Sequence, residues 1–402
     1  MKFASLCYIA ALAPLLSSAC LLPEERAGLP RKVPLLRRQS NGIAIGTGDR
    51  YSGGTIAPRG VGSQTVTLTS LLNVDEIASG LKGLASIYGI STFTTPYTTY
   101  NGATISNGKV GGNGTCNNAY RVYLNSSIHA RERGASDGLL FFIGDLLYAN
   151  KNNTALSTGI VFIPLSNPDG VAYDQSSNSC WRKNRNPASS GGSASSIGVD
   201  LNRNFDFIWD LTWWASSVRS EVASTSPSSE VFHGTAAFSE PETKSIKWVM
   251  DTFSKSKTST MNFLNSAYNS VRGILSDTPG TNGRYGEYTP AAENTDNIKA
   301  ATRIGSAMST TAARTYSVIL AAGLYPTSGA SDDYSYSRHF ADTSKNLIHG
   351  YTVEFGFGNS AASCPFYPTQ AQHNSNIKEI GAGFMELLLA AAEIGLGKTT
   401  AC

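Results

Sequence analysis

The sequence of 402 residues is poor in charge: Asp, Glu, Lys and Arg together make up 15% of it, and the net charge is only +3. It has no dense Lys/Arg tract, which argues against a nucleic-acid partner. After the N-terminal region it has no apolar run long enough to cross a bilayer, so we expect no membrane partner. Low charge with abundant Ser, Thr, Asn and Gly is typical of a secreted protein, which we expect to be a monomer.

The N-terminus supports export. A single lysine precedes the apolar run "FASLCYIAALAPLL", and small residues follow it, so we predict a signal peptide over residues 1–19. Residues 20–40 are rich in Pro and Arg and contain the dibasic pair at 37–38. They are either a short propeptide trimmed by a processing protease or a disordered linker. Residues 41–402 are predicted to form one folded domain.

Cysteine is scarce as well, with six residues in the whole sequence. No pair has the C-x-x-C spacing of a cysteine zinc site. Two cysteines belong to the leader region, and in an oxidising compartment the remaining four favour two disulfides, with three possible connectivities. These four are Cys116, Cys180, Cys364 and Cys402.

Helical and strand-like segments alternate along the chain. The segment "NVDEIASGLKGLASIY" has apolar residues at helical spacing, with Asn73 as its N-cap and Glu76 completing a capping box. Further helices are expected at 136–149, from Pro241, near 296–313 and at 376–394, and strands at 121–128, 159–166, 261–266, 315–321 and 350–356. This alternation predicts a single α/β domain with a central mixed parallel and antiparallel sheet flanked by helices.

A histidine and a carboxylate stand at the end of the strand expected at 121–128. The stretch "SIHARERG" places His129 three residues before Glu132. Neutral imidazole and carboxylate are both zinc ligands, and sites in such sheets form at the carboxyl ends of strands. The alternative is a surface turn with a local hydrogen bond. A catalytic zinc usually takes three protein ligands plus water, so this pair is incomplete.

Other polar residues stand in apolar surroundings. Arg185 in "SCWRKNRN", and Asn202 with Arg203 in "GVDLNRNFDFIW", could hold a carboxylate, because a guanidinium offers a planar fork of donors. The alternative is an ordinary surface ion pair. Glu354 lies inside the apolar strand "YTVEFG", where burial is costly unless the carboxylate is paired or functional. Burial could raise its pKa into the range of a general base.

Together these segments resemble the zinc metallocarboxypeptidases of the carboxypeptidase A/B type, over about residues 65–395. The matching blocks occur in the family's order: "HARER", "NPDG", "WRKNRN", "DLNRNF", "FHGTAAFSEPET", "LYPTSGASDDYSY" and "YTVEFG". The resemblance implies the fold of that family, one zinc ion as cofactor, and hydrolysis of the C-terminal residue of peptides or proteins.

The resemblance also implies a role for each matching residue. His129 and Glu132 match two zinc ligands, and Glu354 matches the general base that activates water. Arg185 matches the arginine that polarises the scissile carbonyl. The substrate-contacting positions are matched by Arg131, by Asn202 and Arg203 for the terminal carboxylate, by Tyr325 as the closing tyrosine, and by Asp332 at the floor of the specificity pocket.

Two further expectations follow from the resemblance. An acid at Asp332, seven residues after Tyr325, resembles the enzymes that remove C-terminal Lys or Arg, although the adjacent Asp333 leaves the register open. The segments around Cys180 and Cys364 border the family's substrate cleft, which favours a Cys180–Cys364 bridge and pairs Cys116 with Cys402.

The family's third zinc ligand is a histidine in a block like "DIHSY", and the corresponding stretch here is "MNFLNSAYNSVRGIL". It places Ser266 or Ala267 at the ligand position, and no histidine occurs between His233 and His339. Two hypotheses follow. The chain is a secreted carboxypeptidase with another third ligand or a weaker metal site, or it is a non-catalytic relative that binds peptide C-termini.

Overall fold

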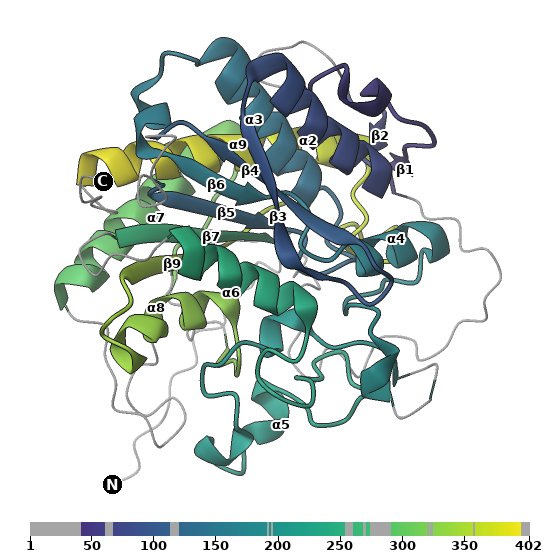
Figure 1. Cartoon of the computed structure of the whole chain (residues 1–402), viewed down its shortest axis with the longest axis vertical. Helices are drawn as coiled ribbons and strands as arrows, with labels where there is room; N and C mark the ends of the chain where they lie inside the picture. The colour runs from purple at the N-terminus through teal and green to yellow at the C-terminus, as the bar shows by residue number, and fades with distance from the viewer. Residues whose placement is uncertain are drawn as a thin grey trace, which may run out of the picture.

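A seven-stranded mixed sheet forms the centre of the chain (Figure 1). The computed structural model describes residues 42–60, 67–112, 120–190, 193, 196–253, 260–267, 271–273, 291–319, 321, 325–356 and 358–394. The predicted signal peptide and the segment 20–40 lie outside these residues, as do Cys116 and Cys402.

The strand order in the sheet is β3-β4-β6-β5-β7-β9-β8. The inner pairs β6–β5, β5–β7 and β7–β9 are parallel, and the pairs β3–β4, β4–β6 and β9–β8 are antiparallel. The strands span Ser91–Thr98 (β3), Thr104–Val110 (β4), Val122–Ser126 (β5), Ile160–Ile163 (β6), Thr260–Ala267 (β7), Val271–Gly273 (β8) and Leu347–Glu354 (β9). Ala44–Ile45 (β1) and Ser70–Leu71 (β2) form a separate two-stranded sheet.

Both faces of the inner strands are buried. In β5, Val122 and Leu124 belong to one hydrophobic cluster, whereas Tyr123 belongs to a second one. The same alternation separates Phe162 from Val161 in β6. Successive side chains of a strand point to opposite faces, so continuous apolar strands such as these require helices on both sides of the sheet.

Helices provide that cover (Figure 1). One face is covered by Val74–Tyr88 (α2), Ala135–Ala149 (α3), Ala291–Ala312 (α7) and Gln370–Ile394 (α9), and the other by Pro241–Phe253 (α6) and Ser331–Ala341 (α8). Pro168–Ser177 (α4) and Arg219–Val222 (α5) lie in the connections, with 3₁₀ turns at Ser52–Gly54 (η2), Thr154–Thr158 (η4), Pro187–Ser190 (η5), Leu201–Arg203 (η7) and Leu211–Trp213 (η8).

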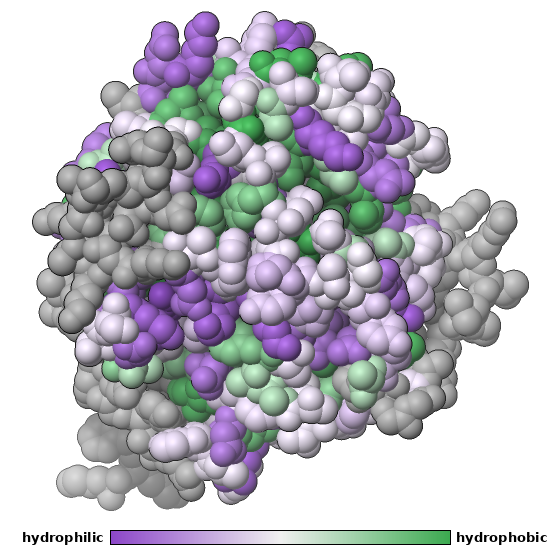
Figure 2. All heavy atoms as spheres, viewed as in Figure 1, coloured by the Kyte–Doolittle hydropathy of each residue, from purple (hydrophilic) through white to green (hydrophobic). Residues whose placement is uncertain are grey.

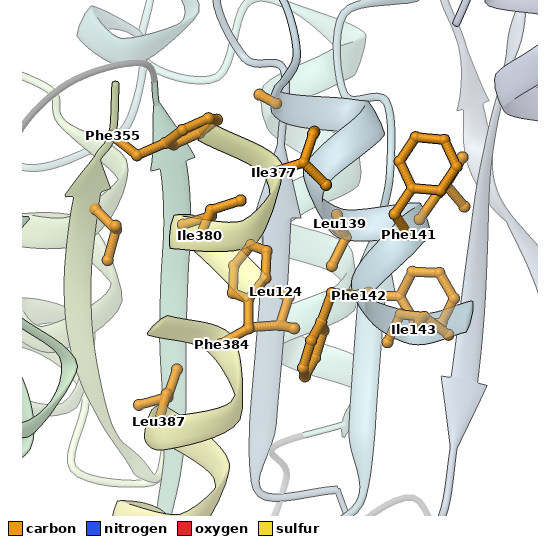
Figure 3. Close-up of a cluster of buried hydrophobic side chains, with 14 of the residues drawn as sticks. Leu124, Leu139, Phe141, Phe142, Ile143, Phe355, Ile377, Ile380, Phe384 and Leu387 are labelled. Carbon is orange, nitrogen blue, oxygen red and sulfur yellow. The ribbon is translucent and has the colours of Figure 1, made fainter. Parts of the chain in front are cut away.

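The larger core cluster lies between the sheet and the helices α3 and α9 (Figure 3). From α9, Ile377, Ile380 and Phe384 point toward the sheet, where Leu124 of β5 meets them. Phe142 of α3 packs on Phe384 with 5.2 Å between ring centroids. Fully burying side chains of this size contributes roughly 1.5–3 kcal/mol each, so this layer holds α3 and α9 rigidly against β5.

Most of the predicted elements are confirmed, and so is the α/β domain with its mixed sheet. The helix at 74–88 forms with Asn73 as its N-cap, and the reciprocal bonds of the capping box to Glu76 are present. The strand expected at 315–321 is wrong: its described residues Thr315–Ile319 are not in a strand, and the amide of Tyr316 bonds Oγ of Ser309 instead. The sequence analysis also missed β3, β4 and α8.

On the face seen in Figure 2, apolar side chains are interspersed with polar ones. Within the described part of the chain, every helix falls short of the length and apolarity needed to span a membrane.

Two carboxylates are buried around the start of α6. Glu242 is fully buried (0% exposed), and its Oε2 accepts a hydrogen bond from Nδ2 of Asn184 at 3.1 Å. The same amide donates to Oε2 of Glu240 at 2.7 Å. Oε1 of Glu242 has no hydrogen-bond partner among the described residues. Burial, and also the nearby charge of Glu240, raise the pKa of Glu242 to about 8.

This pKa makes the stability pH-dependent. Because the pKa in the folded chain lies above the ordinary value of 4.5, the folded state holds the proton longer than the unfolded state does. The free energy of unfolding should therefore fall by about 4 kcal/mol as the pH rises from 4.5 through 8. Glu242→Gln should remove most of this fall in urea unfolding curves at pH 5 and pH 8.5. The exposed Glu221→Gln is the control, and equal pH dependence of the two variants would contradict the assignment.

Candidate active site

The parallel pairing of β5, β7 and β9 brings the carboxyl ends of these strands to one edge of the sheet. β5 runs into the loop that carries His129 and Glu132, and β9 ends at Glu354. A cleft opens at this edge. Its lining consists of His129, Glu132, Arg182, Asn202, Arg203, Ala321, Tyr325, Thr327, Ala330, Asp332, Thr352 and Glu354.

The ring of His129 is held at both nitrogens. Its Nδ1 lies 2.6 Å from Oε1 of Glu132, and its Nε2 lies 3.1 Å from Oδ1 of Asp200. All three side chains are buried. The second oxygen of Glu132, Oε2, has no hydrogen-bond partner among the residues that the structure describes. A buried carboxylate oxygen without a partner is costly, and a cation is one group that would satisfy it.

Arg182 balances the charge of these carboxylates. Its Nε donates to Oδ2 of Asp200 at 2.9 Å, and its Nη1 lies 3.9 Å from Oε1 of Glu132. Burial opposes ionisation of Asp200, but the charges of Arg182 and His129 outweigh it and hold the pKa of Asp200 well below its usual value. The same reasoning applies to Arg182. Burial lowers its pKa, but the charges of Asp200 and Glu132 outweigh burial and raise the pKa above its usual value. Two cationic or basic groups and two acids therefore form one compact cluster.

Arg203 is different, because its guanidinium forms no ion pair with an acid among the described residues, although its charge helps to lower the pKa of Asp200. It is 2% exposed, and Nη1 donates to the backbone oxygen of Asn202 at 2.8 Å. Nε and Nη2 are buried with no hydrogen-bond partner among the described residues. Guanidinium N–H groups that lack hydrogen-bond partners beside a cleft are well placed to bind the two oxygens of a carboxylate.

The backbone around Arg203 is closely packed against the start of α8. Oδ1 of Asn202 accepts a hydrogen bond from the amide of Ser331 at 2.8 Å. Gly329 has a φ of +67°, and a Cβ there would lie 2.3 Å from the backbone oxygen of Arg203. A side chain at position 329 is therefore excluded by both conformation and space.

Asp332 lies in the first turn of α8 and is buried at the cleft wall. Its Oδ2 accepts a hydrogen bond from Oγ1 of Thr352 at 3.0 Å. Thr352 is two residues before Glu354 on β9, so α8 and β9 present an acid each to the same cleft. Tyr325, partly exposed, completes the wall.

The structure brings most of the predicted site residues together. The cleft is lined by His129, Glu132, Asn202, Arg203, Tyr325, Asp332 and Glu354. Arg131 stands beside it rather than in its lining: Nη1 bonds both oxygens of Glu230 at 3.1 Å, and the guanidinium lies 4.6 Å from the ring centre of Phe366.

The placement of Arg185 is a correction. Its guanidinium stacks over the rings of Tyr173 and Trp181, at 3.7 Å and 4.6 Å from their centres, and it is not part of the cleft lining. Arg182 occupies the cleft in its place. The sequence analysis assigned the cleft arginine of "WRKNR" to Arg185 rather than to Arg182. It also missed Asp200, whose signal was an acid directly before the "LNRN" segment.

The predicted disulfide between Cys180 and Cys364 is present, with 5.4 Å between the Cα atoms. It joins the segment of Arg182 to the segment that follows Glu354. Arg131 contacts both sides of this link, because its Nη1 donates to the backbone oxygen of Cys180 at 3.3 Å while its guanidinium packs on Phe366.

The residues that the structure describes do not form a complete zinc site. His129 and Glu132 are suitable ligands, but the described residues contain no group of three His, Cys, Asp or Glu side chains that could hold a metal ion. The strand between them and Glu354 is β7, in which Ser266 pairs with Ser126 and Ala267 with Glu354. No histidine occurs in this strand. The donor set thus fits zinc at two positions and fails at the third.

The other histidines lie elsewhere. His233 stacks on Trp209 with 4.3 Å between ring centroids, His349 is buried in β9, and Nε2 of His373 lies 3.3 Å from Oδ2 of Asp137. The fifth, His339, bonds the backbone oxygen of Lys345 at 2.7 Å. None of the four is in the cleft lining.

The chain belongs to the zinc carboxypeptidase family, because the sequence model of that family matches residues 84–381. It is similar to mouse carboxypeptidase A4, with 35% identity over 31% of this chain and 28% of the mouse protein. It is also similar to zinc carboxypeptidase A 1 of Drosophila melanogaster (32% identity, 48% of this chain, 43% of the fly protein) and to a zinc carboxypeptidase of Simulium vittatum (30% identity, 54% and 65%). The matches thus span between about a quarter and two thirds of the length of these relatives.

Two solved structures share the fold. Bovine thrombin-activatable fibrinolysis inhibitor, in complex with tick carboxypeptidase inhibitor, has a TM-score of 0.63 at 20% identity and covers 81% of this chain and 98% of its own. Carboxypeptidase A of Helicoverpa armigera has a TM-score of 0.62 at 21% identity, covering 81% of this chain and 75% of its own. At these identities the likeness establishes the arrangement of the sheet and helices.

The charge cluster in the cleft predicts a stability effect. Asp200→Asn should destabilise the fold by about 3–5 kcal/mol, because the buried guanidinium of Arg182 loses its nearest acid and, among the described residues, keeps only Glu132 at 3.9 Å. Chemical denaturation at pH 7 measures this loss, with the exposed Asp206→Asn as the control, expected to stay within about 0.5 kcal/mol of the wild type. A similarly small change for Asp200→Asn would show that the cluster contributes little to stability.

Proposed function

We propose that this chain acts on peptides or proteins with a free C-terminus and hydrolyses the terminal residue, as a metallocarboxypeptidase. The observation that carries the proposal is the pair of unmet donors on buried Arg203, at the cleft that also holds His129, Glu132 and Glu354. A buried cation with open donors calls for an anionic ligand, and the C-terminal carboxylate of a peptide is the anion that matches its fork.

The remaining residues of the cleft suit the next steps. Arg182 would polarise the carbonyl oxygen of the scissile bond and stabilise the charge that develops there. Glu354, which also lines the cleft, would accept the proton of the attacking water and return it to the leaving amine. Zinc bound by His129 and Glu132 would have two of the three protein ligands that a catalytic zinc ordinarily takes.

The second candidate is a binder of peptide C-termini without turnover. It is favoured by the absence of a histidine from β7. The carboxylate recognition at Arg203 is the same in both candidates. They differ in whether a metal ion is retained and whether the peptide bond is cut.

Two further features belong to the proposal. Asp332 in the cleft wall supports a preference for C-terminal Lys or Arg, because its charge would pair with a basic side chain. The apolar N-terminal segment with small residues after it supports export, so we propose that the protein is secreted.

Zinc content and turnover separate the two candidates. The hydrolase candidate predicts that the purified protein retains zinc after dialysis, measured by elemental mass spectrometry, and releases lysine from a hexapeptide that ends in Lys. Glu354→Gln should lower this turnover by about 10²–10⁴-fold while leaving the zinc content unchanged. Peptide binding with neither zinc nor turnover would overturn the hydrolase assignment and establish the second candidate.

The side-chain preference has its own test. Asp332→Asn should weaken binding of a peptide ending in Lys by at least about 30-fold, equivalent to about 2 kcal/mol, since it removes one partner of a buried charge pair. Binding of the same peptide ending in Leu should change little. Calorimetric titration in the Glu354→Gln background gives both affinities. An equal loss for both peptides would assign Asp332 a structural role.

A further inference from the structure

Outside the residues that line the cleft, one buried carboxylate joins four segments of the chain. Asp174 of α4 is 0% exposed. Its Oδ1 accepts hydrogen bonds from the hydroxyl of Tyr367 at 2.7 Å and from the amide of Trp181 at 2.8 Å, and its Oδ2 accepts one from Nε of Arg133 at 2.9 Å. None of these four residues is in the lining of the described cleft. We call this set the Asp174 clamp.

The partners of Asp174 are direct neighbours of cleft residues. Arg133 follows Glu132, and Trp181 precedes Arg182. The carboxylate of Asp174 therefore binds two backbone segments at once. One segment carries Glu132 and the other carries Arg182, and these two side chains lie 3.9 Å apart in the cleft. A backbone bond from the amide of Ala130 to the oxygen of Arg182, at 3.1 Å, spans the same two segments.

Tyr367 extends the clamp to a third segment. Its hydroxyl donates to Asp174 and accepts a hydrogen bond from the amide of Cys180 at 2.9 Å. The guanidinium of Arg133 lies 3.4 Å from the centre of its ring. Since Cys180 is bonded to Cys364, three residues before Tyr367, this part of the clamp is closed covalently.

We propose that Asp174 is a positioning residue that sets the placement of Arg182 relative to Glu132 from outside the cleft. The inference rests on the proposed function, in which Arg182 contacts the carbonyl oxygen of a bound peptide. Arg203 is carried by η7, whose N-cap Asp200 bonds Arg182, and it is also anchored through Asn202 and the amide of Ser331 at the start of α8. Because this second anchor involves no residue of the clamp, we expect the grip on the terminal carboxylate to depend on Asp174 less than Arg182 does. Asp174 thus affects one of the two arginine contacts with the peptide.

Asp174→Asn keeps the shape of the side chain and removes its charge, so Arg133 loses its ionic partner. If the clamp acts through Arg182, the effects of Asp174→Asn and Arg182→Lys on peptide affinity are not independent. We expect each single variant to weaken binding about fivefold and the double variant to be within about twofold of Arg182→Lys alone. Asp174→Asn combined with Arg203→Lys should instead show the product of the two single effects, within about twofold.

The experiment is a double-mutant cycle on the full chain. The probe is a hexapeptide ending in Lys with a free carboxylate, titrated by calorimetry in the Glu354→Gln background so that it is not consumed. The matched control is Asp169→Asn, another buried acid of α4, which bonds Oγ1 of Thr99 and the amide of Asn101 at 3.0 Å each. It should be independent of Arg182→Lys. Thermal unfolding confirms that each variant is folded, and Tyr367→Phe replaces Asp174→Asn if that variant does not fold.

The outcomes are distinct. Coupling of Asp174 with Arg182 but not with Arg203 supports the inference. Independent effects in both cycles, or equal coupling to both arginines, overturn it and leave the proposed function standing. No binding of the peptide by the parent protein overturns the proposed function together with the inference.

Discussion

The parallel alignment of β5, β7 and β9 is the constraint on which the site depends. Because the three strands run in one direction, their carboxyl ends meet at one edge of the sheet, and the loop after β5 comes to face the end of β9. His129 and Glu354 are 225 residues apart in the sequence, yet only β7 separates β5, whose following loop carries His129, from β9, which ends at Glu354. Because both faces of these strands are apolar and buried, their register depends on the close packing of individual side chains in the two core clusters, such as Leu124 on one face and Tyr123 on the other.

The charged side chains of the cleft fall into two groups: a cluster around Arg182 in which acids and bases pair, and Arg203, which has buried donors without partners among the described residues. Arg182, His129, Asp200 and Glu132 pair with one another within 3.9 Å, and in this group the buried Oε2 of Glu132 lacks a hydrogen-bond partner among the described residues. Within the described part of the chain Arg203 forms no such ion pair, and two of its buried donors lack a hydrogen-bond partner. This asymmetry indicates where an anion belongs. It supports recognition of a peptide end independently of any metal ion.

Much of the fold was predictable because local signals agreed with the tertiary structure. The helix at 74–88 combined an apolar period with a capping box, and both are present. The strand predicted at 315–321 was wrong because strand propensity alone does not supply a neighbouring strand to pair with. The hydroxyl of Tyr316 instead accepts a hydrogen bond from the amide of Gly356 and donates one to Glu379 of α9. The acids at the start of α8 and the bases at its end suit the helix dipole, a signal that was not used.

The site was predictable by residue type and less so by position. In an irregular segment, the side chains of two arginines three residues apart can point in different directions, and the sequence does not say which one faces the cleft. Arg182 faces it, while Arg185 stacks on aromatic rings outside it. The absence of a histidine from β7 was visible in the sequence, and β7 pairs with β5, which leads to His129 and Glu132, and with β9, which ends at Glu354.

The central claim is that Arg203 binds the terminal carboxylate of a peptide. The most direct measurement compares, by calorimetry, a peptide with a free C-terminus and the same peptide with a C-terminal amide. The account predicts that the acid binds at least about 30-fold more tightly, since the amide leaves the buried guanidinium without an anion. Equal affinity for the two peptides would contradict it.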